Sequence, residues 1–230
     1  MNTLLIRLAA PLQSWGIQSH FEVRDTGREP SKSGVIGLLC AALGRQRDQP
    51  VEDLTSMRMG VRVDREGRLA MDYHTAQDVM KASGAGTKDT EVSRRYYLAD
   101  AVFLVGLEGE DWSLLEGLQK ALQAPHWPLF LGRKAFPPAD PLWLADGLRR
   151  DERLEDALRA YPLLKVSRNP NTRLRLVIED PVGELVRPDW PVSFAERRFA
   201  TRRVRVEFFP APVKLIETER RFHVPDTPNA

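Results

Sequence analysis

Two helical patterns, each lying between strand-like segments, constrain the fold of this chain more than any other feature. In the first, apolar residues recur at the three- and four-residue spacing of one buried helix face between Val35 and Leu43. Ser31 or Ser33 is a natural N-cap, and Gly44 is a natural residue to end the helix. The sequence therefore predicts a helix of about three turns here.

The second helical pattern follows Asp111 and covers residues 112–122, with its leucines on one side. Strand-like segments surround the two helices, at residues 2–11, 57–66, 68–75, 98–109 and 126–134. The predicted order is strand, helix, strand, inserted hairpin, strand, helix, strand. This is the βαββαβ order of an α+β protein with a ferredoxin-like (RRM or RAMP) fold.

The inserted segment, about residues 76–97, has a small and polar centre, ASGAGTKDT. Because it lacks apolar residues to bury, it is predicted to project from the body as a hairpin arm. Residues 1–145 are thus predicted to form one ferredoxin-like domain. Residues 146–230 are predicted to form a smaller β-rich C-terminal subdomain with a frayed tail, built from a short helix and strand-like segments at 172–180, 202–210 and 211–217.

The composition excludes several classes of protein. Of the 230 residues, 42% are hydrophobic and 29% are charged, as in a soluble globular protein, and no run approaches transmembrane length. Cys40 is the only cysteine, which excludes disulfides within the chain and a cysteine zinc site, and favours a reducing cytoplasm. The histidines are far apart and the carboxylates form no compact run, so no metal and no other cofactor is predicted.

The net charge of +2 hides a local excess of arginine between Arg187 and Arg221. Arginine is favoured where phosphates are bound, so this excess suggests a polyanion as partner. A solvated strand face is the commoner origin of a charge run, and it explains the same residues.

The start of the first helix combines free backbone amides and a partial positive dipole with Lys32, and Arg24 lies upstream. This combination suits an anion. A nucleotide-binding P-loop is excluded, because counting from Gly27 puts Lys32 where the second glycine of that motif belongs. A capped surface helix with incidental basic neighbours fits these features equally well.

Several motifs then occur in an order that resembles one family. They are LIRLAAPLQSWG, RDTGREPSKSGVIGLLCAALGR, VRVDREG, DYHT, YYLADAVFLVGLEG and PLFLGRKAFPPADP. Together they resemble the CasD family, subunits of the Cascade CRISPR surveillance complex within the RAMP superfamily, over roughly residues 4–141. Other members often carry Ser-Cys-Pro-Pro where this chain has Ala-Phe-Pro-Pro at 135–138, a departure that touches no group needed for phosphate binding.

The resemblance implies a non-catalytic subunit that holds the repeat-derived 5′ handle of the crRNA at one end of the assembly. It also implies a protruding β-hairpin thumb that packs against the neighbouring backbone subunit and helps to kink the RNA. The large subunit would dock nearby, so that this chain meets target DNA only indirectly. In a related subtype a relative cuts the precursor RNA itself, which makes a metal-independent endoribonuclease the rival hypothesis.

The candidate RNA-binding residues come from these motifs and from the arm. They are Gln13, Ser14, Trp15, Arg24, Lys32, Ser33, Gly34, His74, Arg94, Arg95, Arg133 and Lys134. The basic residues and the helix start suit phosphates, and Trp15 suits stacking on a base, although a tryptophan is more often a core anchor. The rival hypothesis needs a base, an acid and a cation near a 2′-hydroxyl, and the plausible set is His20, Tyr73, His74 and Lys88.

Overall fold

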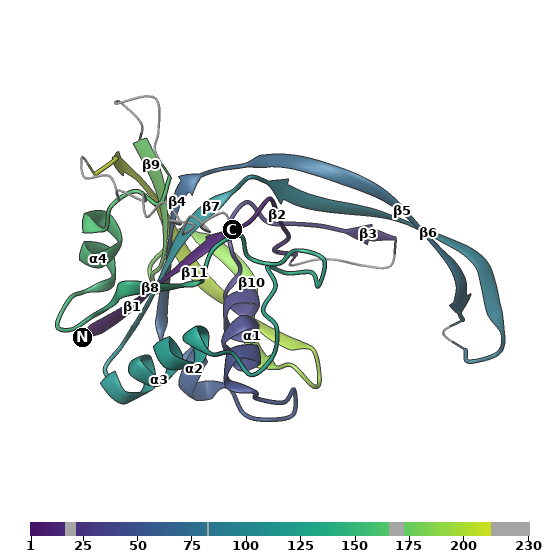
Figure 1. Ribbon diagram of the computed structural model, residues 1–230, viewed down its shortest axis with the longest axis horizontal. Coiled ribbons are helices and arrows are strands. Elements are labelled where there is room, and N and C mark those ends of the chain that lie inside the picture. Colours follow the sequence, from purple (N-terminus) through teal and green to yellow (C-terminus); the bar gives the residue numbers. More distant parts are fainter. Residues whose placement is uncertain (17–21, 82, 166–172, 213–230) are drawn as a thin grey trace, which may run out of the picture.

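The computed structural model describes residues 1–16, 22–81, 83–165 and 173–212, and it shows a mixed α/β protein built mostly of strands (Figure 1). The main sheet has seven strands in the order β10-β11-β9-β4-β7-β1-β8, and all neighbours in it are antiparallel. The strands are β1 (Asn2–Ala9), β4 (Arg58–Arg65), β7 (Val102–Gly109), β8 (Trp143–Arg149), β9 (Arg173–Glu179), β10 (Leu185–Ser193) and β11 (Arg198–Pro210).

A second sheet forms the part that projects from the body (Figure 1). Its long strands β5 (Arg68–Met80) and β6 (Thr87–Ala99) form an antiparallel hairpin, which we call the hairpin arm. Two short strands, β2 (Leu12–Gln13) and β3 (Val23–Arg24), pair with β6. The arm was expected at about 76–97, but it begins at Arg68, so residues 68–75 belong to it and not to the main sheet.

Four helices complete the described fold, α1 (Lys32–Leu43), α2 (Glu52–Thr55), α3 (Trp112–Gln123) and α4 (Leu154–Ala160). The predicted caps of the two long helices are confirmed. The Ser31 hydroxyl accepts a hydrogen bond from the Gly34 amide, and Gly44 ends α1 with a φ of 72°. The Asp111 carboxylate accepts from the Leu114 amide at the start of α3.

The helices cover both faces of the main sheet. Leu4, Ile6 and Leu8 of β1 pack with α1 and α3, whereas Leu5 points to the other face and packs with α4. Glycines in the central strands let α4 lie close to the sheet. A Cβ atom at Gly106 would lie 2.5 Å from Leu154, and one at Gly60 would lie 2.7 Å from Leu158.

The strand predicted at residues 126–134 is wrong, because this segment has no regular secondary structure. Pro128 lacks an amide hydrogen, and Gly132 adopts a φ of 91°. The Leu131 carbonyl accepts a hydrogen bond from the Ser14 amide, so the segment is held as a loop against the β2 region. The place beside β1 is taken by β8.

The C-terminal part supplies β9 and β11, which confirms two predicted strands. The edge strand β10 was missed because Pro188 and Pro191 lie within it, and proline is tolerated at a sheet edge. The division into two domains near residue 145 stays a prediction, although β8 spans that point and β9 continues the sheet beside β4. Most of the predicted strand at 211–217, and the tail, lie outside the described residues. No helix among the described residues is long and apolar enough to cross a membrane.

Candidate nucleic-acid interface

Three of the predicted RNA-binding arginines meet where the hairpin arm joins the body. Arg24 of β3 lies beside Arg95 of β6, because the two strands pair in parallel. Arg133 reaches the same place from the loop after α3. Its guanidinium donates to the carbonyl of Tyr96 at 2.8 Å and to that of Arg24 at 3.4 Å.

These side chains line a cavity of about 400 Å³, which we call the arginine pocket. Its lining residues are Ser14, Gly16, Arg24, Asp25, Arg95, Gly132 and Arg133. Burial lowers the pKa of Arg133, and the nearby charges of Arg95 and Arg24 act in the same direction. The guanidinium stays protonated nevertheless, so the pocket concentrates positive charge that an anion would relieve.

Gly132 allows the loop to approach this pocket. A Cβ atom at this position would lie 1.7 Å from the Ser14 carbonyl oxygen, and the φ of 91° is itself unfavourable for other residues. The close approach of the Gly132 backbone to the Ser14 backbone therefore fixes the position of Arg133. Lys134, the next residue, is exposed and makes no hydrogen bond or ion pair within the described residues.

Gln13 and Trp15 lie inside the protein, so the expected contact of these two residues with RNA is corrected. Gln13 is fully buried and donates to the carbonyls of Leu8 and Ala101. Trp15 is 2% exposed and donates from its indole nitrogen to Gln13. Its ring packs against Gly34, where a Cβ atom would lie 2.9 Å away. Of this segment, Ser14 and Gly16 line the arginine pocket, and Gln13 and Trp15 do not.

The expected contact of Lys32 with phosphate is corrected for a similar reason. Its side chain is fully buried and forms an ion pair with Glu179 of β9 at 2.9 Å. The ammonium group also donates to the Met57 carbonyl and lies 3.6 Å from the centre of the Trp190 ring. Burial lowers the pKa of Lys32 to about 8, although Glu179 acts in the opposite direction.

The first amide of α1 is also occupied, because Lys32 donates from its backbone to the Asp189 carboxylate at 2.8 Å. Ser33 and Gly34 are partly exposed, and the Ser31 hydroxyl takes the Gly34 amide. The protein itself therefore satisfies the Lys32 and Gly34 amides at the helix start. The interpretation of α1 as a capped helix is the one that these contacts support.

The arginine excess of the C-terminal part is largely neutralised within the chain. Arg202 pairs with Asp189 and Glu179, and Arg205 pairs with acidic groups of other segments. Arg187 pairs with Glu29. The sequence hid this compensation because the carboxylates come from distant positions. Lys214, Arg220 and Arg221 lie outside the described residues.

The arm carries the remaining candidates on different sides. Arg94 is exposed and pairs across the strands with Tyr73. Tyr73 and Lys88 line one cavity of about 240 Å³ together with Arg94, and His74 is not among its lining residues. His74 lies 3.7 Å from Asp72, and as the neighbour of Tyr73 it points to the opposite face of the strand.

The described residues thus do not bring the whole cleavage set together, and His20 lies outside them. Nor do they contain a cluster of His, Cys, Asp and Glu that could hold a metal ion.

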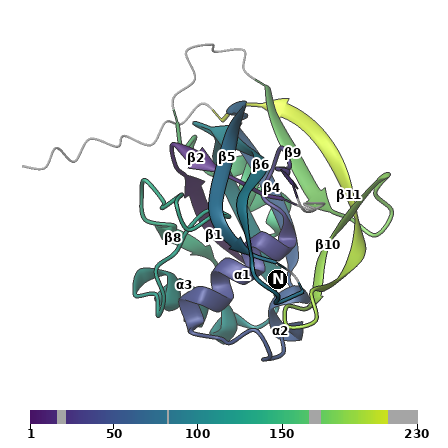
Figure 2. The same cartoon turned by 90° about the vertical axis from the view of Figure 1, so that its right-hand side faces the viewer.

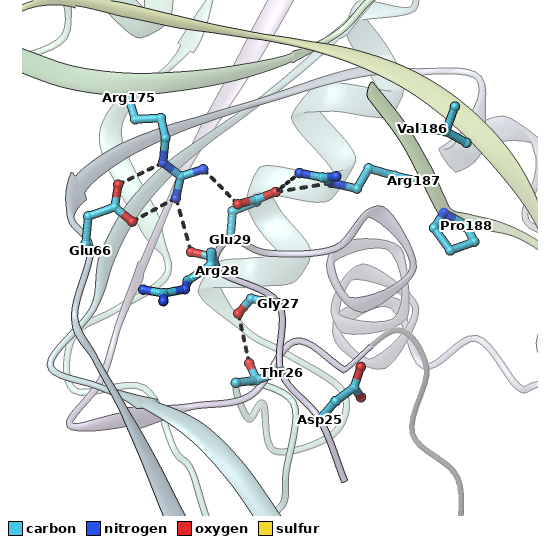
Figure 3. Close-up of a pocket in the computed structure, with 10 residues that line it drawn as sticks. All are labelled: Asp25, Thr26, Gly27, Arg28, Glu29, Glu66, Arg175, Val186, Arg187 and Pro188. Atoms are coloured by element: carbon cyan, nitrogen blue, oxygen red, sulfur yellow. Dashed lines mark hydrogen bonds and ion pairs between the residues drawn. The ribbon is translucent and has the colours of Figure 1, made fainter. Parts of the chain in front are cut away.

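A second cavity, of about 690 Å³, adjoins the first through Asp25, which lines both (Figure 3). We call it the clasp pocket. Its lining residues are Asp25, Thr26, Gly27, Arg28, Glu29, Glu66, Arg175, Val186, Arg187 and Pro188. No sequence pattern singled it out, because its charges come from the loop before α1, the end of β4, and strands β9 and β10.

Arg175 holds the clasp pocket together. Its guanidinium binds both oxygens of Glu66, at 2.7 and 2.8 Å, and one oxygen of Glu29 at 2.8 Å (Figure 3). Arg187 binds the other oxygen of Glu29 at 3.0 Å. Burial opposes the charge of Arg175, but the hydrogen bonds that it donates to Glu66 and Glu29 outweigh burial and raise the pKa of Arg175.

Comparison with known proteins identifies the family to which this chain belongs. The family model described as CRISPR-associated protein (Cas_Cas5) matches residues 3–205. The chain therefore belongs to the Cas5 family of CRISPR-associated proteins.

Three relatives give the family closer definition. The CRISPR system Cascade subunit CasD of Escherichia coli (strain K12) is 36% identical over 155 residues, which make up 61% of this chain and 69% of that protein. A crystal structure of a Cas protein is 48% identical, with a TM-score of 0.76 over 91% of this chain and 97% of that one. A chain in a CRISPR RNA-guided surveillance complex is 36% identical, with a TM-score of 0.78 over 93% and 92% of the two chains.

Proposed function

We propose that this chain is a non-catalytic subunit of a Cascade surveillance complex, in which it holds the repeat-derived 5′ handle of the crRNA. The arginine pocket carries the proposal. It gathers Arg24, Arg95 and Arg133 at the foot of the hairpin arm and leaves Arg24 without a side-chain partner in the described part of the chain. Arginine forks bind phosphate without reading sequence, which suits a subunit that anchors one end of an RNA strand.

The fold reading is part of the same proposal. We assign β1, α1, β4, β7, α3 and β8 to a ferredoxin-like βαββαβ unit, and the hairpin arm to its thumb. The strand order β4-β7-β1-β8 and the packing of α1 and α3 on one sheet face support this assignment. Figure 2, turned by 90° from Figure 1, places β5 and β6 in front of the body and β10 and β11 to one side.

The arm is proposed to contact the neighbouring backbone subunit. Three side chains on one face of β5, those of Leu69, Met71 and Tyr73, are about half exposed or more. A row of large apolar side chains along a projecting hairpin suits contact with another protein. The large subunit is proposed to dock nearby, with target DNA met only indirectly, and the cytoplasm is the proposed compartment.

Cleavage of precursor crRNA is the alternative, and one observation favours it. Tyr73, Lys88 and Arg94 share a cavity on the arm, and such side chains can serve acid, base and cation roles without a metal. Incubation of the protein with end-labelled repeat RNA in EDTA tests this directly. Intact RNA on a denaturing gel supports the non-catalytic role, and one cut at the base of the handle that Tyr73→Phe abolishes supports the enzyme.

Binding of handle RNA by an Arg24→Ala, Arg95→Ala double variant tests the main proposal. Loss of two phosphate contacts is expected to weaken binding at least tenfold at low salt. It should also flatten the plot of log affinity against log salt by about 0.7 per contact, or about 1.4 in total.

The matched control is Arg197→Ala with Arg198→Ala, which removes two exposed arginines that line neither pocket. Affinity and salt slope should stay at the wild-type values in this control. Equal slopes for the wild type and the arginine-pocket variant would refute the anchoring role.

A further inference from the structure

The arginine pocket and the clasp pocket lie along one short segment of chain. Arg24 belongs to the first, Asp25 lines both, and residues 26–29 line the second. An RNA strand with a phosphate on the three arginines can therefore place a neighbouring base in the clasp pocket. This continuity is the starting point for a function of the second cavity, and it rests on the function proposed above.

The charge of the clasp pocket differs from that of its neighbour. Arg28, Arg175 and Arg187 line it, and so do the same number of carboxylates, from Asp25, Glu29 and Glu66. The arginine pocket has only Asp25 against its three arginines. A balanced cavity gives little advantage to a phosphate, whereas a neutral group that both donates and accepts hydrogen bonds fits it. A nucleobase is such a group.

The size and walls of the clasp pocket suit a base. Its volume of about 690 Å³ is in the range of small-molecule sites. Val186 and Pro188 give it an apolar wall from β10, on the far side from Glu66 in Figure 3. The Arg28 guanidinium has no hydrogen bond or ion pair within the described residues, and a guanidinium plane can stack on a base.

Glu66 is a fixed acceptor at one end of this cavity. Each of its oxygens accepts one hydrogen bond from Arg175, and each keeps the capacity to accept another. The bidentate pair fixes the direction of the carboxylate, and the side chain is half exposed. A group that donates a hydrogen to one of these oxygens, such as the exocyclic amino group of a base, suits that edge.

We propose that the clasp pocket reads one base of the bound RNA strand, and that Glu66 selects a base with an exocyclic amino group. Cytosine, adenine and guanine carry such a group, whereas uracil carries an oxygen in place of the amino group of cytosine. A carboxylate opposite that oxygen leaves two acceptors facing each other. The arginine pocket thus supplies affinity for the RNA strand, and the clasp pocket supplies a preference for a base with an exocyclic amino group over uracil.

Binding of the octanucleotides oligo(C) and oligo(U) to the purified chain tests this proposal, because each homopolymer presents the same base in every register. The wild type is expected to bind oligo(C) about tenfold more tightly, the ratio that one good polar contact to a base gives. Glu66→Gln should bring the ratio close to one, because an amide both donates and accepts. Arg95→Ala should weaken both complexes and keep the ratio.

A second variant avoids the ion pairs, in case Glu66→Gln loosens the fold. Val186→Trp fills the cavity from a half-exposed position and should abolish the preference while affinity for oligo(U) stays within about twofold. Equal binding of both homopolymers by the wild type, or a ratio that both variants keep, overturns the base-reading role and leaves the anchoring role intact. Failure of the wild type to bind either homopolymer overturns both.

Discussion

The start of α1 and the arginine pocket are both basic, and Lys32 of the first shares a sequence motif with Arg24 of the second, but the fold uses them in opposite ways. Lys32 points inward to Glu179 and the Trp190 ring, where no partner molecule can reach it. Arg24 and Arg95 point into an open cavity that has one carboxylate. A basic residue in a sequence thus becomes either part of an internal ion pair or a contact for a partner molecule, and the position of the nearest carboxylate decides which. We call the internal ion pair of Lys32 with Glu179 the internal strut.

The difference also separates stability from binding. An internal ion pair fixes how the C-terminal strands sit on α1, because Glu179 and Asp189 come from β9 and β10. The open arginines fix nothing comparable and repel one another. Their self-repulsion costs stability in the free protein, and we expect bound RNA to relieve it.

The largest expected effect is the loss of the internal strut. Lys32→Met leaves the Glu179 carboxylate with the Met59 amide at 3.4 Å and, as its charged partner among the described residues, Arg202 at 3.6 Å. Removal of one partner of a buried pair costs about 3–5 kcal/mol. Thermal or denaturant unfolding measures this loss. The salt slope of RNA binding by the folded variant should equal that of the wild type, because no phosphate contact is lost.

Lys134→Met is the matched control for this change, because Lys134 is an exposed lysine in the same chain. Its unfolding free energy should change by less than about 0.5 kcal/mol. If Lys32→Met were as stable as this control and had a flatter salt slope, Lys32 would be a phosphate contact after all.

These contrasts show what the sequence could predict. The caps at Ser31 and Asp111 and the strand at 173–179 follow from local spacing, so they were predicted correctly. The family motifs pointed to Arg24 and Arg133, and the predicted arm pointed to Arg95; the fold brings these three residues together. Burial of Lys32 was not predictable, because Glu179 is far away in the sequence and joins it only through the pairing of β9 with β4.

The clasp pocket was hidden for the same reason. Glu29, Glu66 and Arg175 lie on three segments, and no spacing rule connects them. The loop at 126–134 could not be predicted for a different reason. Its apolar residues resemble those of a strand, and only the contact of Gly132 with the Ser14 backbone reveals that the segment is a support for the pocket.

A smaller effect is expected where that support is removed. Gly132→Ala puts a Cβ atom into the Ser14 carbonyl at a φ of 91°, and backbone strain of this kind costs about 1–3 kcal/mol. Because the loop carries Arg133, RNA affinity should fall together with stability. Fluorescence-monitored unfolding and RNA titration of the same preparation measure the two losses.

Gly84→Ala controls for the backbone strain alone. Gly84 also has a positive φ, of 72°, but a Cβ atom there meets nothing within 4 Å. It should lose only about 1 kcal/mol and no RNA affinity. If the two alanine variants bound RNA equally well, the close approach of the loop to Ser14 would have no part in building the arginine pocket.

The last prediction is a dependence of stability on pH, which is expected for the Lys32–Glu179 pair and not for the open arginines. The pKa of Lys32 in the folded protein is about 8, below its ordinary value of 10.5, so between these values the unfolded chain binds more protons. Stability due to Lys32 must therefore rise with pH across this window, by at most about 1.4 kcal/mol per pH unit. Cys40 acts in the opposite direction, because burial raises its pKa to about 11.

The difference in unfolding free energy between the wild type and Lys32→Met cancels the term from Cys40, since both proteins keep that thiol. This difference should grow from pH 8 to pH 10. The corresponding difference for Arg95→Ala should stay flat, because a guanidinium does not titrate there. A flat difference for Lys32→Met would mean that Glu179 holds the ammonium charged throughout, and that the strut is a stronger ion pair than its burial implies.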